Sequence, residues 1–175
     1  MTLLDELLDA NRRAVQTAGA PGSFVANRHL CIVTCVDPRL TRWFGPALGV
    51  ERGHAVAIRV PGAHVAPGSD VLRAVAAAIY VNDCQEVLVL AHTDCGTSKL
   101  GAKDLERTMI QRGVPRQAVP SSDVAEFFGL VSDLRAATFE SVRAIREAPY
   151  LPRMPVHAAI MDIGTGALTV WERGY

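Results

Sequence analysis

Three short apolar segments rich in β-branched residues constrain the fold of this chain more than any other feature. Each carries apolar side chains at consecutive positions, so both faces are expected to be buried, as in parallel strands covered by helices. A stretch with apolar residues at helical spacing, SDVLRAVAAAIYV, lies between the last two segments and begins at a capping candidate, Ser69 or Asp70. This order predicts a β-α-β unit. The three strand segments are HLCIVTC (29–35), HAVAIRV (54–60) and EVLVLAH (86–92).

The rest of the chain extends this pattern, and we expect one α/β domain over residues 1–175 with a central parallel sheet flanked by helices. The start, MTLLDELLDANRR, places leucines on one side of a helix and predicts an N-terminal docking helix within residues 1–20. A polar, proline-containing stretch at about 111–123 predicts an exposed loop. A helical region through about Glu147 and a closing strand segment, HAAIMDIGTGALTV, with a turn at 164–166, should follow.

Charge and hydropathy narrow the class of protein. The chain has 18 basic and 18 acidic side chains and a formal net charge of zero, which gives no reason to expect nucleic acid or a membrane surface as a partner. No apolar run approaches the roughly 20 residues that span a bilayer, and the acidic start is unlike a signal peptide. We therefore expect a cytoplasmic protein whose four cysteines are reduced thiols.

Reactive side chains follow the predicted strands at their carboxyl ends. The first strand leads into Cys35, Asp37 and Arg39, the second into RVPGAHV, and the third into HTDC, residues 92–95. In an open parallel sheet, functional sites gather at this edge. The sequence therefore predicts one site built from several strand ends.

Cysteine and histidine spacing suggests a metal site. His92 and Cys95 are separated by two residues on a turn, and Cys35 adds a third soft ligand from another strand end. Cys31 lies four residues before Cys35, about 13 Å along a strand, and is too far to share the ion. Cys84 precedes the third strand and is expected at its other end. Two thiolates and one imidazole suit Zn²⁺, and three ligands leave a coordination position for water or substrate.

Asp37 and Arg39 are the predicted catalytic pair. Pro38 ends the strand, which allows Asp37 to turn back towards the metal held by Cys35, while Arg39 holds the carboxylate in a charge-assisted pair. Two thiolates cancel the metal charge, so the bound water needs help to lose its proton. An ionised Asp37 can accept the proton of a zinc-bound hydroxide and orient it. If released by Arg39, Asp37 can instead take the fourth ligand position and close the site.

Other interpretations of these five residues stay open at this point. The two cysteines and His92 also fit a buried thiol pair beside a core histidine, or a Cys35 nucleophile with His92 as its base. Asp37 and Arg39 also fit a purely structural ion pair.

Several further residues have two interpretations. His64 can shuttle protons near the site or serve as an ordinary hydrogen-bonding histidine. Asp70 with Arg73 can form a contact near the pocket or a helix-start pair. The remaining histidines and aromatic residues are expected to be structural or to lie at a subunit contact: His29, His54, His157, Trp43 and Phe44.

The motifs CVDPRL and HTDCG together resemble the beta class of carbonic anhydrases, most closely the short prokaryotic members. The resemblance continues through AIRVPGAHV and MDIGTGAL, and it implies one zinc per chain on Cys35, His92 and Cys95 with an Asp37–Arg39 dyad. It also implies a parallel sheet of four strands and at least a homodimer, with the N-terminal helix packed on the partner and the active site near the subunit boundary. The implied reaction is reversible hydration of carbon dioxide to bicarbonate by zinc-bound hydroxide.

One departure from the family concerns the substrate. The family usually has Arg-Asn-Ala-Gly after the second strand, whereas residues 59–62 here read RVPG, which removes a polar side chain and a backbone donor. Relatives with the same zinc and dyad residues hydrolyse carbonyl sulfide or carbon disulfide. Such a hydrolase, and a catalytically silent zinc-binding relative, are therefore the two alternatives.

Overall fold

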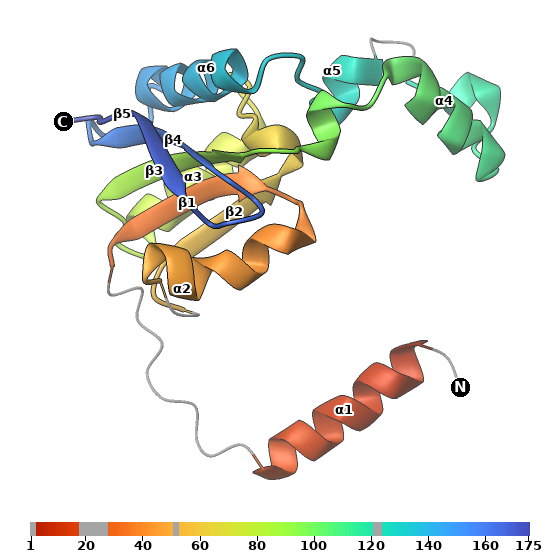
Figure 1. Cartoon of the computed structure of the whole chain (residues 1–175), viewed down its shortest axis with the longest axis horizontal. Coiled ribbons are helices and arrows are strands. Elements are labelled where there is room, and N and C mark those ends of the chain that lie inside the picture. The colour runs from red at the N-terminus through yellow and green to blue at the C-terminus, as the bar shows by residue number, and fades with distance from the viewer. Residues whose placement is uncertain (1–2, 18–27, 51–52, 121–123) are drawn as a thin grey trace.

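The fold centres on a five-stranded sheet in the order β2-β1-β3-β4-β5 (Figure 1). The computed structural model describes residues 3–17, 28–50, 53–120 and 124–175. The first four strands of this order pair in parallel, and β5 is antiparallel to β4. The predicted α/β class with a mainly four-stranded parallel sheet is confirmed, and a fifth strand is added beyond the turn at 164–166. The bounds are β1 Leu30–Cys35, β2 Val56–Val60, β3 Glu86–His92, β4 Val156–Met161 and β5 Leu168–Glu172.

Helices α3 (Asp70–Tyr80) and α6 (Leu134–Glu147) cover one face of the sheet. Ser69 occupies the predicted cap position of α3, but its side chain makes no capping bond. Asp133 caps α6 by accepting from the backbone N–H groups of the first helical turn, which satisfies donors that have no helical partner. The core on this face includes Leu72, Val75, Val142 and Ile145 from the helices and Cys31, Val33, Val87 and Val89 from the strands.

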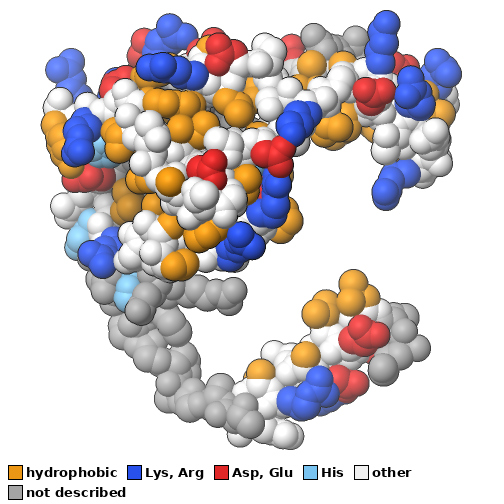
Figure 2. Space-filling model, in the orientation of Figure 1, with side chains coloured by type: hydrophobic (Ala, Val, Ile, Leu, Met, Phe, Trp, Pro, Cys, Tyr) orange, Lys and Arg blue, Asp and Glu red, His pale blue; other side chains and the backbone are white. Residues whose placement is uncertain are grey.

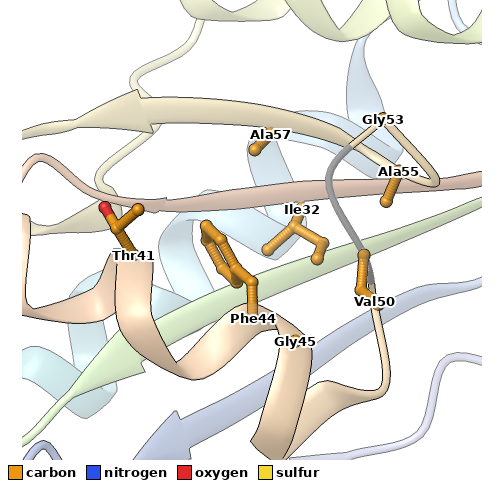
Figure 3. A pocket seen from close by; sticks show the side chains of 8 residues that line it. All are labelled: Ile32, Thr41, Phe44, Gly45, Val50, Gly53, Ala55 and Ala57. Atoms are coloured by element: carbon orange, nitrogen blue, oxygen red, sulfur yellow. The ribbon is translucent and has the colours of Figure 1, made fainter. Parts of the chain in front are cut away.

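The opposite face of the sheet is covered over part of its area by the 3₁₀-helix η1 (Pro38–Trp43) and by α2 (Phe44–Leu48). Its core contains alternate strand residues, such as Ile32 and Leu90, beside Leu40 of η1. Next to this cover is a mainly apolar pocket of about 370 Å³ between η1, α2 and strands β1 and β2 (Figure 3). The pocket is lined by Ile32, Thr41, Phe44, Gly45, Val50, Gly53, Ala55 and Ala57.

The region between β3 and α6 contains more elements than expected. Helix α4 (Ala102–Gln111) is followed by a 3₁₀ turn, η4 (Arg116–Ala118), and by α5 (Val124–Phe128). The helical region expected through about Glu147 is present but is divided into two helices, because Gly129 has φ of +62° and ends α5 before α6 begins. Part of the predicted loop, residues 121–123, lies outside the described residues, and the loop assignment stays a prediction.

Helix α1 (Leu3–Thr17) has an exposed apolar side. Leu3, Leu4, Leu7 and Leu8 expose between 71% and 47% of their surface, and Figure 2 shows hydrophobic side chains gathered along one side of this helix. Residues 1–2 and 18–20 of the predicted docking segment lie outside the described part of the chain. Among the described helices, none combines the length and hydropathy needed to cross a membrane.

Candidate metal centre

The ends of β1 and β3 bring the three predicted ligands together. Cys35 is the last residue of β1 and His92 the last residue of β3, two strands that pair in parallel, and Cys95 follows on the turn after β3. The Cys35 and Cys95 Sγ atoms are 3.8 Å apart, and the three ligand atoms lie within 4.8 Å of one another. All three side chains are buried. This arrangement is a possible metal site of the size that one ion requires.

The remaining two cysteines lie elsewhere. Cys31 and Cys84 belong to the core on the α3 side of the sheet, away from the cluster. Burial raises the pKa of Cys31 to about 12, and the nearby Cys84 adds to the shift. Both are therefore buried thiols at neutral pH, and Cys31 lies apart from the cluster, as the rise of an extended strand predicted.

The His92 ring is oriented for metal binding. Its Nδ1 lies 2.8 Å from the backbone oxygen of Thr93, so Nδ1 carries the proton and donates it to that oxygen. This leaves a lone pair on Nε2, a fully buried atom with no hydrogen-bond partner. A buried polar atom without a partner is costly, and a cation between it and the two sulfur atoms would satisfy it. The donor set of two thiols and one imidazole fits zinc.

The two sulfur atoms differ in their tendency to lose a proton. The hydrogen bond between the two sulfur atoms raises the pKa of Cys35, with burial adding to the effect. The same bond lowers the pKa of Cys95 well below its usual range, helped by His92 and Thr97. Backbone N–H groups of Asp37 and Gly62 donate to the Cys35 sulfur. The surroundings therefore stabilise the thiolate form of Cys95, the form in which cysteine binds a metal, whereas the thiolate of Cys35 would need a bound cation to stabilise it.

Asp37 and Arg39 form a bidentate pair beside the cluster. Arg39 Nε lies 3.0 and 3.1 Å from the two carboxylate oxygens of Asp37, and Nη2 lies 2.7 Å from Oδ2. These bonds lower the pKa of Asp37, so its carboxylate is ionised at neutral pH. The same Oδ2 is 4.0 Å from His92 Nε2. The structure therefore places the charged carboxylate of Asp37 beside the proposed ligands, 4.0 Å from His92 Nε2.

Asp94 holds Arg39 from the other side and was not singled out in the sequence. Arg39 Nη1 donates to Asp94 Oδ2 at 2.7 Å, Nη2 donates to the Asp94 backbone oxygen at 3.0 Å, and Lys99 donates to Oδ1. These contacts lower the pKa of Asp94 to about 2, and the hydrogen bond from Arg39 has the largest effect. The guanidinium is thereby fixed between two carboxylates. Asp94 has φ of +57°, and such a local backbone conformation leaves little signal in the sequence.

Arg59 is a second residue that the sequence interpretation missed. From the end of β2, its Nε donates to the Cys35 backbone oxygen at 3.0 Å, and its Nη2 donates to the backbone oxygen of Asp37. Its Nη1 donates to Thr41 Oγ1 at 2.7 Å, which fixes η1 as well. The sequence did contain a sign of this role, because Arg59 is the one charged residue in the apolar segment 54–60. A partly buried guanidinium in such a strand needs several acceptors.

The segment that departs from the family pattern runs beside the cluster. Val60 lies opposite Cys35 in the β1–β2 register, and its side chain packs against the core on the α3 side. Pro61 begins the 3₁₀ turn η2 (Pro61–Ala63). Gly62 has φ of +62°, and a Cβ added there would meet Thr97 Oγ1 at 3.0 Å. Both the backbone angle and the limited space therefore favour glycine at this position.

The other candidates have local partners. The backbone N–H of His64 donates to the Pro61 carbonyl and its ring lies near Gly129, so its role as a shuttle stays a prediction. Asp70 and Arg73 form an exposed pair at the start of α3. The following side chains have partners other than the three proposed ligands: His29 with Asp83, His157 with Glu86, Trp43 with the Ile163 backbone, and Phe44 in the apolar pocket.

Comparisons with known proteins agree with this geometry. The family model described as carbonic anhydrase matches residues 30–127, more than half of the chain. Beta-carbonic anhydrase 1 of Mycobacterium tuberculosis strain H37Rv is 28% identical over 169 residues, which cover 96% of this chain and 97% of the relative. The crystal structure of beta-carbonic anhydrase isoform I from Trichomonas vaginalis superposes with a TM-score of 0.83 at 28% identity, covering 100% of both chains.

A more distant relative carries a different name. The carbon disulfide hydrolase of Acidithiobacillus thiooxidans is 22% identical over 144 residues, which cover 73% of this chain and 64% of that protein. The family match spans β1 to α5 and so includes both motifs on which the resemblance rested. The chain therefore belongs to the beta-carbonic anhydrase family.

Proposed function

We propose that this protein catalyses the reversible hydration of carbon dioxide to bicarbonate and a proton, with one zinc ion per chain. The observation that supports this most directly is the buried cluster whose three ligand atoms lie within 4.8 Å of one another, with Asp37 Oδ2 4.0 Å from His92 Nε2. Family membership supports the same reaction.

Cys35, His92 and Cys95 are the proposed zinc ligands. Their number leaves one coordination position open, which is typical of catalytic zinc and not of structural zinc. When bound, zinc supplies a Lewis acid that acidifies a water molecule for attack on the carbon of carbon dioxide. The Thr93 carbonyl fixes the His92 tautomer so that Nε2 keeps its lone pair for the metal.

Asp37 is the proposed proton acceptor, and Arg39 is its orienting partner. The carboxylate is 13% exposed, so it reaches both the buried cluster and solvent. Because Arg39 is itself held by Asp94, the carboxylate has little freedom to rotate away. Asp37 can then accept a hydrogen bond from a nucleophile, orient it and receive its proton. Released from Arg39, the same carboxylate can occupy the fourth ligand position and close the site.

Stopped-flow hydration of carbon dioxide at pH 7 and pH 9 tests this function, on protein shown to contain one zinc per chain. We expect turnover that rises from pH 7 to pH 9, because two thiolates neutralise the metal charge and acidify water less than three neutral histidines do. Protein stripped of zinc by a chelator should lose turnover and regain it with zinc. No hydration at either pH in zinc-loaded protein contradicts the proposal.

A carbon disulfide or carbonyl sulfide hydrolase is the second candidate. It is favoured by the named relative from Acidithiobacillus thiooxidans and by the apolar Val60 and Pro61 beside the cluster. Release of sulfide, with weak hydration of carbon dioxide by the same zinc-loaded sample, would favour it. Full zinc occupancy without turnover of any of these three substrates would indicate the third alternative, a silent zinc-binding relative.

A homodimer is the proposed minimal assembly, with α1 packed on the partner. The exposed leucines of α1 need an apolar surface to cover them, and the pocket between η1 and β2 shows that the main body has exposed apolar surface as well. The cytoplasmic location remains a prediction from the sequence.

Replacing Leu4 and Leu7 with glutamate should weaken this dimer. Burial of one leucine contributes about 1.5–3 kcal/mol, so the pair should raise the dissociation constant on the order of 100-fold or more. Light scattering over a range of concentrations measures the effect. Val81→Glu is the control, because Val81 is 79% exposed on another helix end and should leave the dimer unchanged. A wild-type monomer, or an unaltered dimer in the double variant, contradicts the role of α1.

A further inference from the structure

Thr97 contacts one of the proposed zinc ligands directly. It lies two residues after Cys95 in the 3₁₀ turn η3 (Gly96–Ser98), and its Oγ1 is 3.0 Å from Cys95 Sγ. The Thr97 backbone N–H donates to the same sulfur. Ser98 donates from both its backbone and its hydroxyl to the Cys95 carbonyl. The turn therefore holds Cys95 by its sulfur and its carbonyl together.

The direction of the Thr97 bond follows from the chemistry of the ligand. A cysteine that coordinates a metal is a thiolate and has no proton to give. The hydroxyl of Thr97 must then be the donor, and the sulfur the acceptor. Among the described residues, Cys95 Sγ is the partner recorded for this hydroxyl.

The position of the hydroxyl is fixed by its neighbours. A Cβ on Gly62 would lie 3.0 Å from Thr97 Oγ1, so the hydroxyl already occupies the space next to the Gly62 backbone. Val131, which is buried, donates its backbone N–H to the Thr97 carbonyl at 3.3 Å. Threonine is β-branched, so its χ1 rotation is restricted. Gly62, Val131 and the turn together leave the hydroxyl directed at the sulfur.

We propose that Thr97 is a positioning residue for the metal centre: its hydroxyl donates to the Cys95 thiolate, fixes that ligand and withdraws electron density from its sulfur. The inference rests on the proposed metal centre and is independent of which substrate the enzyme uses. The Gly62 backbone N–H donates to the other sulfur, of Cys35. Gly62 also packs against Thr97. This packing connects the residue beside the Cys35 sulfur with the residue beside the Cys95 sulfur.

Three forms of the protein test the proposal: wild type, Thr97→Val and Thr97→Ser. Valine keeps the branched shape and removes the hydroxyl, whereas serine keeps the hydroxyl. Each is loaded with Co²⁺, whose sulfur-to-metal charge-transfer absorption reports the electron density on the thiolates. Zn²⁺ affinity is measured in parallel by competition with a chromophoric chelator. Thr108→Val is the matched control, because that hydroxyl donates to Asp104 on α4.

We expect Thr97→Val to move the charge-transfer band to lower energy, since a sulfur without the hydrogen bond gives up an electron more easily. Its zinc affinity should fall roughly 10- to 100-fold, the usual effect of removing a partner of a metal ligand. Thr97→Ser and Thr108→Val should match wild type in both measurements. A folded Thr97→Val protein that takes up no cobalt, beside a Thr97→Ser protein that does, also supports the role.

Two outcomes would contradict the proposed role of the Thr97 hydroxyl. A Thr97→Val spectrum that superimposes on wild type shows that the hydroxyl does not act on the sulfur. A Thr97→Ser protein that behaves like the valine variant shows that the methyl group matters and the hydroxyl does not. Wild-type protein that binds neither cobalt nor zinc contradicts the metal centre itself, and the proposed function with it. Metal-loaded wild type without hydration contradicts the proposed function and leaves the Thr97 measurement valid.

Discussion

Replacing Cys35 with serine is expected to abolish both zinc binding and hydration of carbon dioxide. Cys35 is one of three proposed ligands, and a serine hydroxyl stays protonated at neutral pH, so it cannot replace a thiolate. Removing a partner of a ligand alone costs about 10- to 100-fold in affinity, and removing the ligand should cost on the order of 100-fold or more. Zinc content after gel filtration and stopped-flow turnover measure the two losses together.

Cys84→Ser is the matched control for this variant. It makes the same substitution at a buried thiol that lies outside the cluster. The control should keep one zinc per chain and its turnover, although a buried hydroxyl will lower its stability. If Cys35→Ser retained zinc at wild-type affinity, the assignment of Cys35 as a ligand would be wrong.

Asp37→Ala should separate these two effects, with zinc retained and turnover lost. The carboxylate lies 4.0 Å from His92 Nε2 and is bound to Arg39, so it is placed to act on a nucleophile without serving as one of the three ligands. Loss of a general base typically lowers the rate by roughly 10²- to 10⁴-fold. Zinc content and turnover at saturating carbon dioxide separate the two quantities.

Asp37 also caps η1 by accepting from the Arg39 backbone N–H at 2.9 Å, so alanine removes a structural contact as well. Asp37→Asn separates these roles, because the amide oxygen can still accept at the cap and only the charge and the proton acceptor are lost. We expect the asparagine variant to keep its zinc and to be nearly as slow as the alanine variant. If both variants contained no zinc, the assignment of Asp37 to proton transfer and not to zinc binding would be wrong.

The elements that form the sheet and the cluster were predictable because each depends on a strong pattern over several residues. Consecutive apolar residues before Cys35 and His92 indicated buried parallel strands, and the carboxyl ends of such strands meet at one edge. The exclusion of Cys31 followed from the rise of an extended chain, since four residues separate it from Cys35. These arguments need only the register of a strand, which its hydrophobic pattern determines.

The contacts missed in the sequence depend on single backbone angles. Asp94 reaches Arg39 from a residue with φ of +57°, and Thr97 reaches Cys95 within one 3₁₀ turn beside Gly62. Neither conformation has a residue pattern that identifies it, because short polar turns accept many sequences. The break between α5 and α6 at Gly129 was missed for the same reason, although an isolated glycine in a helical stretch can mark the end of a helix.

Arg59 has a consequence for how the site responds to motion of the sheet. One guanidinium binds the backbone oxygens of both Cys35 and Asp37, and it extends from β2, the first strand in the sheet order. A proposed metal ligand and the proposed proton acceptor are thus attached to the same rigid planar group. Thermal displacement of β2 should carry the two residues in the same direction and preserve their separation. The separation between the backbones of these two residues should therefore change little when the outermost strand fluctuates.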